Sequence, residues 1–143
     1  MKNRPIVGVG AILIKSSSIL IGKRLGSHGA GTLALPGGHL EYNETFAECA
    51  SREVEEETGL RIPPEAFQFS YATTDVFPEL QKQYVTIFVQ ANVEDDADAK
   101  TMEPHKCAGW TWTPWASLRN QTPLFRPLET LLATNFNPFQ RSS

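Results

Sequence analysis

The sequence predicts an α/β fold built on a mixed β-sheet, and two observations lead to this fold class. Strand-like and helix-like segments are interspersed without the strict strand–helix alternation of a doubly wound parallel sheet. The chain has 143 residues, of which 41% are hydrophobic and 20% are charged, so it can bury one core of ordinary size. We therefore expect a single domain over residues 1–143, in which helices pack on a mixed sheet.

The first part of the chain predicts a β-hairpin followed by a short strand. Residues 6–14 and 18–22 are rich in β-branched residues and are joined by the polar turn 15–17, so we expect two paired strands. Residues 26–31 contain three glycines and predict a flexible loop. Residues 32–35 form the next short strand, which a Pro-Gly-Gly sequence should end.

One long helix is predicted next, over residues 43–58. Apolar residues recur four positions apart from Phe46 to Val54, which is the spacing of one buried helix face. We expect Asn43 to be the N-cap, because its side chain can accept a hydrogen bond from the first turn. Gly59 follows as the C-terminal stop.

The second half of the chain predicts more strands than helices. Residues 67–77 and 83–93 are rich in β-branched and aromatic residues and predict two strands, and residues 108–112 predict a third. Proline at a first helical position predicts two short helices, over residues 114–118 and 127–134.

The charge and cysteine content exclude several classes of protein. The formal net charge is −3, without the clustered Lys and Arg that polymeric DNA or RNA requires. Cys49 and Cys107 lie far apart and outside any C-x-x-C arrangement, which favours cytosolic thiols over a zinc site or a disulfide. The first apolar stretch is short and closed by Lys15, so we expect neither a signal peptide nor a membrane span. A cytoplasmic location is the expectation.

An acidic stripe on the long predicted helix is the candidate functional site. At about 100° per residue, Glu56 lies about 60° to one side of Glu53 and Glu57 about 40° to the other, so the three share a face. Such carboxylates repel one another unless a cation compensates. Mg²⁺ prefers oxygen ligands, and the Gly37-Gly38 turn lets the backbone approach an ion closely. The competing interpretation, which a Glu-rich helix alone would favour, is a solvated surface.

The spacing around the acidic stripe favours the metal site. The pattern is G-x5-E-x7-R-E-U-x-E-E-x-G-U, where U is aliphatic, and its positions are Gly38, Glu44, Arg52, Glu53, Val54, Glu56, Glu57, Gly59 and Leu60. All nine match the Nudix box, so the chain resembles the Nudix hydrolase superfamily. Further similarity in residues 35–41 and 103–107, and around Trp110 and Trp112, indicates a MutT-like subgroup that includes eukaryotic purine nucleotide triphosphate diphosphatases.

The resemblance implies a fold, a cofactor and an activity. The fold would be the Nudix fold, an α/β/α sandwich with a mixed sheet and the loop-helix-loop of the box. The activity would be Mg²⁺-dependent hydrolysis of nucleoside triphosphates, in particular ordinary or modified purine deoxynucleotides, to nucleoside monophosphate and pyrophosphate. Mn²⁺ would substitute for Mg²⁺. The partner would be a small nucleotide, with no polymeric nucleic acid and no membrane. Similarity to relatives that look dimeric also implies a homodimer.

The resemblance also assigns roles to the residues of the box. The metal ligands would be Gly38, through its carbonyl, Glu53, Glu56 and Glu57. One glutamate would also be the base for the attacking water, and similarity to MutT favours Glu53. Arg52 would hold a box carboxylate in orientation, or it would be a surface partner of an acidic residue one turn away. Glu44 is left between helix capping and support of the metal site.

The substrate-binding residues that the resemblance implies lie mostly outside the box. They are Arg24, His39, Thr86, Lys106, Phe125 and Leu128. The Arg24 guanidinium suits a phosphate, and the Phe125 ring can stack on a base, although an edge-strand charge and a core ring are the structural alternatives. Glu103 fits an exposed loop residue better than a ligand. The chain departs from close relatives at Arg126-Pro127, where they carry an aromatic residue, so the base preference is left open.

Two other functions compete with this one. The same metal-binding helix would serve hydrolysis of NADH, ADP-ribose or another nucleoside diphosphate linked to a second group, although the short motifs of the NADH and coenzyme A enzymes are not found. A binding module of the same fold that has lost catalysis is the third interpretation. The intact acidic stripe argues against it, because the fold alone does not require three repelling carboxylates.

Overall fold

Seven strands form one mixed sheet in the computed structural model, which describes residues 3–26 and 28–140. The strands are β1 (Ile6–Lys15), β2 (Ser18–Arg24), β3 (Leu33–Ala34), β4 (Gly37–His39), β5 (Gln68–Phe77), β6 (Lys82–Asn92) and β7 (Cys107–Pro114). The helices are α1 (Phe46–Thr58), α2 (Trp115–Leu118) and α3 (Arg126–Leu132), with 3₁₀ turns η1 (Pro64–Ala66) and η2 (Pro78–Leu80). Within the described residues, none of these helices has the length and apolar character to cross a membrane.

Strand β1 lies at the centre of the sheet. The order is β3-β2-β1-β6-β5, with β4 paired to β1 and β7 paired to β2. Strand β1 runs parallel to β6, with Ile6 opposite Tyr84 and Ile14 opposite Asn92, and antiparallel to β2 and β4. The sheet is therefore mixed, as predicted, because the only parallel pair among the described strands is β1–β6.

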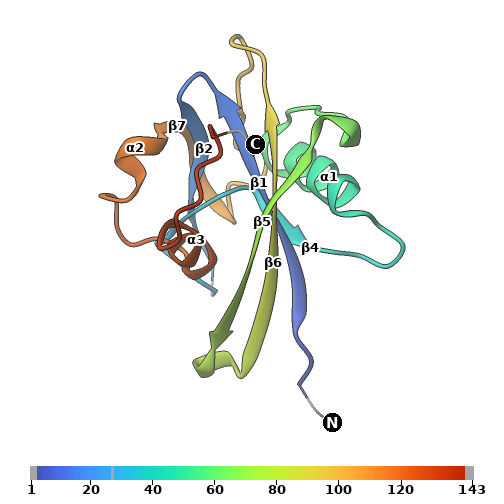
Figure 1. The fold of residues 1–143 in the computed structure, drawn as a ribbon, viewed down its shortest axis with the longest axis vertical. Helices are drawn as coiled ribbons and strands as arrows, with labels where there is room; N and C mark the ends of the chain where they lie inside the picture. Colours follow the sequence, from blue (N-terminus) through green and yellow to red (C-terminus); the bar gives the residue numbers. More distant parts are fainter. Residues whose placement is uncertain (1–2, 27, 141–143) are drawn as a thin grey trace.

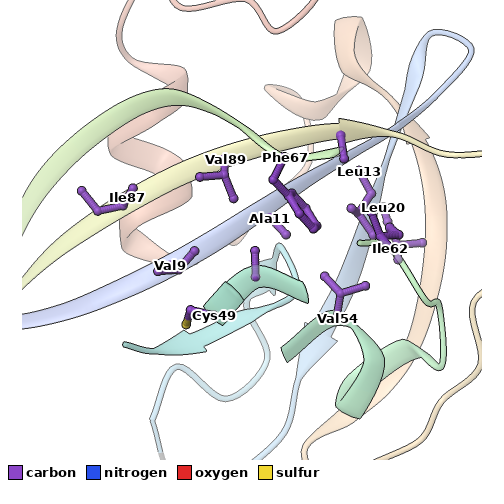
Figure 2. Close-up of a cluster of buried hydrophobic side chains, with 12 residues drawn as sticks. Val9, Ala11, Leu13, Leu20, Cys49, Val54, Ile62, Phe67, Ile87 and Val89 are labelled. Carbon is purple, nitrogen blue, oxygen red and sulfur yellow. The ribbon is translucent and has the colours of Figure 1, made fainter. Parts of the chain in front are cut away.

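Two apolar cores lie on opposite faces of the sheet. Alternate residues of β1, from Val9 to Leu13, pack with Cys49 and Val54 of α1, as Figure 2 shows. The intervening residues of β1 pack with α2 and α3 on the other face. Figure 1 shows α1 on one side of the strands and α2 and α3 on the other. The predicted α/β/α sandwich is confirmed.

The N-cap of α1 lies two residues later than predicted. Thr45 is the N-cap: its side chain accepts a hydrogen bond from the Glu48 N–H, and the Glu48 carboxylate accepts one from the Thr45 N–H. The prediction of Asn43 was wrong, because Asn43 has a left-handed φ of 67° and lies in the preceding turn. The reciprocal Thr-x-x-Glu pattern outweighs a single capping residue. Gly59, at φ 77°, ends the helix as predicted.

Strand β4 was not predicted, because its Pro-Gly-Gly sequence is typical of a break in secondary structure. Gly37 and Gly38 instead pair with Gly10 and Val9 of β1. A Cβ on Gly37 would lie 2.1 Å from the Val9 carbonyl oxygen, so the pairing requires glycine at this position. The glycines thus let a short strand lie close to β1 and continue into α1.

Replacing Thr45 by alanine should lower the free energy of unfolding by about 1 kcal/mol, because the helix loses its N-cap hydrogen bond. Thr45→Ser should retain nearly all of the stability, because its hydroxyl can accept the same bond. Asn43→Gly should have a smaller effect than Thr45→Ala, since glycine tolerates the left-handed backbone. Urea unfolding of the three variants provides the measurement, and a larger loss at Asn43 than at Thr45 would contradict the assignment.

Candidate active site

Two adjoining cavities meet at β4, whose residues line both. We call one the apolar cavity: it has a volume of about 180 Å³, and its walls include Tyr84, Thr86 and Phe88 of β6 together with Phe125 and Leu128. We call the other the acidic cavity: it has a volume of about 390 Å³, and its walls include Glu53, Glu57, Glu103 and Lys106. The two cavities share the residues Arg24, Ala34, Leu35, Gly37, Gly38 and His39. One molecule can therefore occupy both cavities at once.

The acidic cavity brings two carboxylates of α1 against the backbone of β4. The Gly37 N–H donates to Glu57 Oε2 over 3.2 Å. A Cβ on Gly38 would lie 2.4 Å from the Glu53 carboxylate, so only glycine permits this approach. Burial, followed by a hydrogen bond and charge repulsion from Glu53, raises the pKa of Glu57 to about 9. Without a cation, the Glu57 carboxyl is thus held in its protonated form near neutral pH.

Arg52 binds the carboxylates beside the cavity. Its Nε and Nη2 donate to the two oxygens of Glu44 over 2.7 and 3.0 Å, and its Nη1 donates to Glu53 Oε1 over 2.6 Å. The hydrogen bonds from Arg52 lower the pKa of Glu44 to about 2. Glu44 is therefore the bidentate partner of Arg52. This contact fixes the orientation of the guanidinium, which in turn holds the Glu53 carboxylate.

Glu56 lies apart from the other two predicted ligands. Its side chain is 51% exposed, it lies 3.6 Å from Arg52 Nη1, and it lines neither cavity. Within residues 3–26 and 28–140, no group of three or more His, Cys, Asp or Glu side chains is placed to hold a metal ion. The Arg52 guanidinium attracts both Glu53 and Glu56.

The donor set in the acidic cavity nevertheless fits a hard divalent cation. Two carboxylates, Glu53 and Glu57, face a shared space beside the Gly38 backbone. Mg²⁺ is usually held by one or two carboxylates together with waters and substrate phosphates, so two suffice. A cation there would also offset the burial and the repulsion from Glu53, which raise the pKa of Glu57.

All six predicted substrate-binding residues line the cavities. Thr86, Phe125 and Leu128 line the apolar cavity, Lys106 lines the acidic one, and Arg24 and His39 line both. Thr86 and Leu128 are buried, with exposures of 8% and 2%. Their roles stay predictions, but the structure gathers residues from five separate parts of the chain at one place.

Arg24 lies at the boundary of the cavities. Its guanidinium carbon lies 4.1 Å from the centroid of the Phe125 ring, and its Nε donates to the His28 carbonyl over 3.1 Å. A Cβ on Gly29 would lie 2.8 Å from the Phe125 ring, so glycine at this point of the loop lets Arg24 and Phe125 stay in contact. The boundary therefore combines the positive charge of Arg24 with the aromatic ring of Phe125.

Sequence reasoning missed His28, which also lines the apolar cavity. Its ring centroid lies 4.8 Å from that of Phe77, 5.5 Å from Phe125 and 6.0 Å from Tyr84. Burial lowers the pKa of His28, and its Nε2 is buried without a hydrogen-bond partner in the described structure. A single histidine in a glycine-rich loop gives no signal of this environment. Tyr84, by contrast, could have been found from its position two residues before Thr86 on one strand face.

The family model of the NUDIX domain matches residues 4–133, so the chain belongs to this family. An ADP-ribose pyrophosphatase of Methanocaldococcus jannaschii is 39% identical over 74 residues, which are 52% of this chain and 44% of that protein. The chain thus corresponds to less than half of the length of this relative. The predicted superfamily is confirmed.

Solved structures share the fold. The MutT NUDIX hydrolase from Burkholderia pseudomallei matches with a TM-score of 0.82 and 24% identity, covering 93% of this chain and 99% of that one. A bifunctional NMN adenylyltransferase/ADP ribose pyrophosphatase from Francisella tularensis, complexed with AMP and a manganese ion, matches with a TM-score of 0.70 and 21% identity. That match covers 92% of this chain and 41% of the other. The predicted Nudix fold is confirmed.

Glu57→Gln should stabilise the metal-free protein increasingly as the pH rises. The folded pKa of about 9 exceeds the ordinary value of 4.5, so the folded state binds this proton more strongly than the unfolded state does. Its stabilising contribution is complete below pH 4.5 and is lost as the pH rises towards 9, by at most about 1.4 kcal/mol per pH unit. Glutamine cannot lose this proton.

The measurement is urea unfolding of both proteins in a chelator across that pH range. Glu55→Gln provides the control, because Glu55 lies on the exposed side of α1 and pairs with Arg61. Its stability should follow the wild-type pH dependence. A constant difference between Glu57→Gln and wild type at all pH values would contradict the raised pKa.

Proposed function

We propose that the protein hydrolyses nucleoside triphosphates to nucleoside monophosphate and pyrophosphate with the help of a divalent cation. The adjoining cavities carry this proposal. An apolar cavity walled by rings and aliphatic side chains suits a base, and the acidic cavity beside it suits a cation with phosphates. Arg24 and His39 line both cavities, where the sugar-phosphate part of such a substrate would lie.

The proposed roles follow from the position of each side chain. Glu53, Glu57 and the Gly38 carbonyl would hold Mg²⁺ or Mn²⁺. Glu56 stays a predicted further ligand, and its side chain would have to turn from Arg52 towards the acidic cavity to bind the same cation. A bound cation would neutralise charge on the phosphate oxygens and lower the pKa of water. Arg24 and Lys106 would bind phosphate. The base would lie against Thr86, Phe125 and Leu128.

The reaction requires one carboxylate that accepts a proton. The water oxygen forms a bond to phosphorus, the bond from phosphorus to the leaving phosphate oxygen breaks, and the water proton passes to a glutamate. Glu53 is the proposed base, because Arg52 fixes its carboxylate through a 2.6 Å hydrogen bond beside the cavity. Glu57 would be confined to cation binding. Arg52 acts through Glu53 and is therefore a positioning residue.

Hydrolysis of ADP-ribose or another linked nucleoside diphosphate is the second candidate activity. The similarity to the ADP-ribose pyrophosphatase of Methanocaldococcus jannaschii supports it, since the match is 39% identical over 74 residues. The acidic cavity would serve either reaction, because both break a phosphoanhydride bond. The apolar cavity of about 180 Å³ is of a size for one base, and a nucleoside triphosphate and ADP-ribose each carry one base, so this cavity fits both candidates. The cytoplasmic location and the homodimer stay predictions.

A panel of nucleoside triphosphates, ADP-ribose and NADH, tested with Mg²⁺ and with a chelator, would separate the candidates. We expect pyrophosphate release from triphosphates only when Mg²⁺ is present. Faster turnover of ADP-ribose than of every triphosphate would favour the second activity. Binding of nucleotides without turnover of any compound would show that the protein is a binding module.

Glu57→Gln should lower kcat by about 10³-fold or more while the protein remains folded, because a cation ligand is lost. The matched control is Glu55→Gln, which makes the same substitution on the same helix at a half-exposed position outside both cavities. The control should retain kcat within about twofold. Equal activities of Glu57→Gln and wild type would overturn the assignment of the site.

A further inference from the structure

One wall of the apolar cavity belongs to the segment of residues 123–132, which crosses the sheet from one edge strand to the other. Phe125, Pro127 and Leu128 line the cavity from this segment. At one edge, the Leu33 N–H of β3 donates to the Pro123 carbonyl over 2.9 Å, and the Phe125 N–H donates to the Leu33 carbonyl over 2.8 Å. At the other edge, α3 packs on β5. The wall is thus fixed to both edge strands of the order β3-β2-β1-β6-β5.

A buried carboxylate makes the attachment to β5. Asp75 is 6% exposed, its Oδ1 accepts a hydrogen bond from the Thr130 hydroxyl of α3, and its Oδ2 accepts one from Thr73 over 3.3 Å. Asp75 pairs with Tyr84 across the strands, so its side chain lies on the sheet face that also forms the cavity. Burial of a carboxylate is unfavourable unless specific partners compensate, and here the partner on α3 is Thr130.

Arg126 makes a second attachment to the same strand end. Its Nη1 donates to the Val76 carbonyl, its Nη2 lies 3.9 Å from Glu79, and its guanidinium carbon lies 4.6 Å from the centroid of the Phe77 ring. The Phe77 ring lies 6.0 Å from that of Phe125. Arg126 therefore contacts the end of β5 and does not line the apolar cavity.

We propose that Asp75 and Arg126 are positioning residues that set the placement of the cavity wall and thereby the affinity for the base. Leu131 and Leu132 hold α3 on the sheet through the apolar core, so loss of the polar attachments should displace the wall without detaching the helix. The chemical step takes place in the other cavity and should be little affected. This inference rests on the proposed function, because it assigns the apolar cavity to a base.

The test compares Asp75→Ala and Arg126→Ala with wild type on a nucleoside triphosphate and on ribose 5-triphosphate, which has the same phosphates and no base. For the nucleotide, KM should rise about tenfold, the size of an effect from one imperfect contact in an apolar pocket. Its kcat should stay within about twofold, and KM for ribose 5-triphosphate should not change. An unchanged KM for the nucleotide in both variants, or an equal rise for both substrates, would overturn the proposal.

Three further variants test whether the effect on KM is purely structural. Asp75→Asn keeps the shape and can accept from Thr130 and donate to Thr73, so it should restore the nucleotide KM to within about twofold of wild type. Arg119→Ala removes an exposed arginine at the end of α2 and should change neither KM. If Asp75→Ala does not fold, Arg126→Ala and Thr130→Val carry the comparison, because Arg126 lies at the surface and valine matches threonine in shape.

Calorimetric binding of a nucleoside monophosphate separates this inference from the proposed reaction. If wild type binds the monophosphate but turns over no triphosphate, the proposed reaction fails. The attachments would still be supported by a Kd about tenfold weaker in Asp75→Ala and Arg126→Ala. An unchanged Kd in both variants would overturn the inference whether or not wild type turns over triphosphates.

Discussion

The approach of the α1 carboxylates to the β4 backbone is the contact on which the site depends. Gly38 leaves room for the Glu53 carboxylate, and the Gly37 N–H holds Glu57. The same two glycines pair with β1, so one short strand fixes both the sheet and the acidic cavity. Burial of Glu57, together with the hydrogen bond and the charge repulsion that come from the nearby Glu53, raises its pKa to about 9. The closeness of Glu53 and Glu57 therefore lowers the stability of the metal-free fold, while the same two carboxylates would bind a cation.

The two cavities derive from the alternation of residues along the sheet. Strand β6 presents Tyr84, Thr86 and Phe88 to one face, and that face forms the floor of the apolar cavity. The glycines of β4 connect this floor to the acidic cavity, which α1 borders. The Nudix box therefore accounts for one cavity only. The other depends on residues from Arg24 to Leu128 that no local pattern joins.

The sequence was most informative where a pattern repeats locally. Runs of β-branched residues around a polar turn predicted the hairpin, and apolar periodicity predicted α1. The mixture of strands and helices, together with the family resemblance, predicted the sandwich. Helix geometry predicted one shared face for Glu53, Glu56 and Glu57. Local patterns failed for β4, whose pairing requires a distant partner strand, and for Asn43, because the reciprocal cap between Thr45 and Glu48 prevailed. The aromatic surroundings of His28 could not be predicted either, because the neighbouring rings come from remote segments of the chain. Contacts of this kind arise only from the fold.

The parallel pairing of β1 with β6 has a consequence for synthesis of the protein. Strand β2 follows β1 directly in the chain and can pair with it early. The other edge of β1 pairs with β6, so it stays unpaired until synthesis has passed Asn92, where β6 ends. During that interval an apolar strand exposes unpaired backbone groups, which is the condition that promotes association with other chains. The nascent chain therefore passes through a vulnerable stage, and completion of β6 ends it.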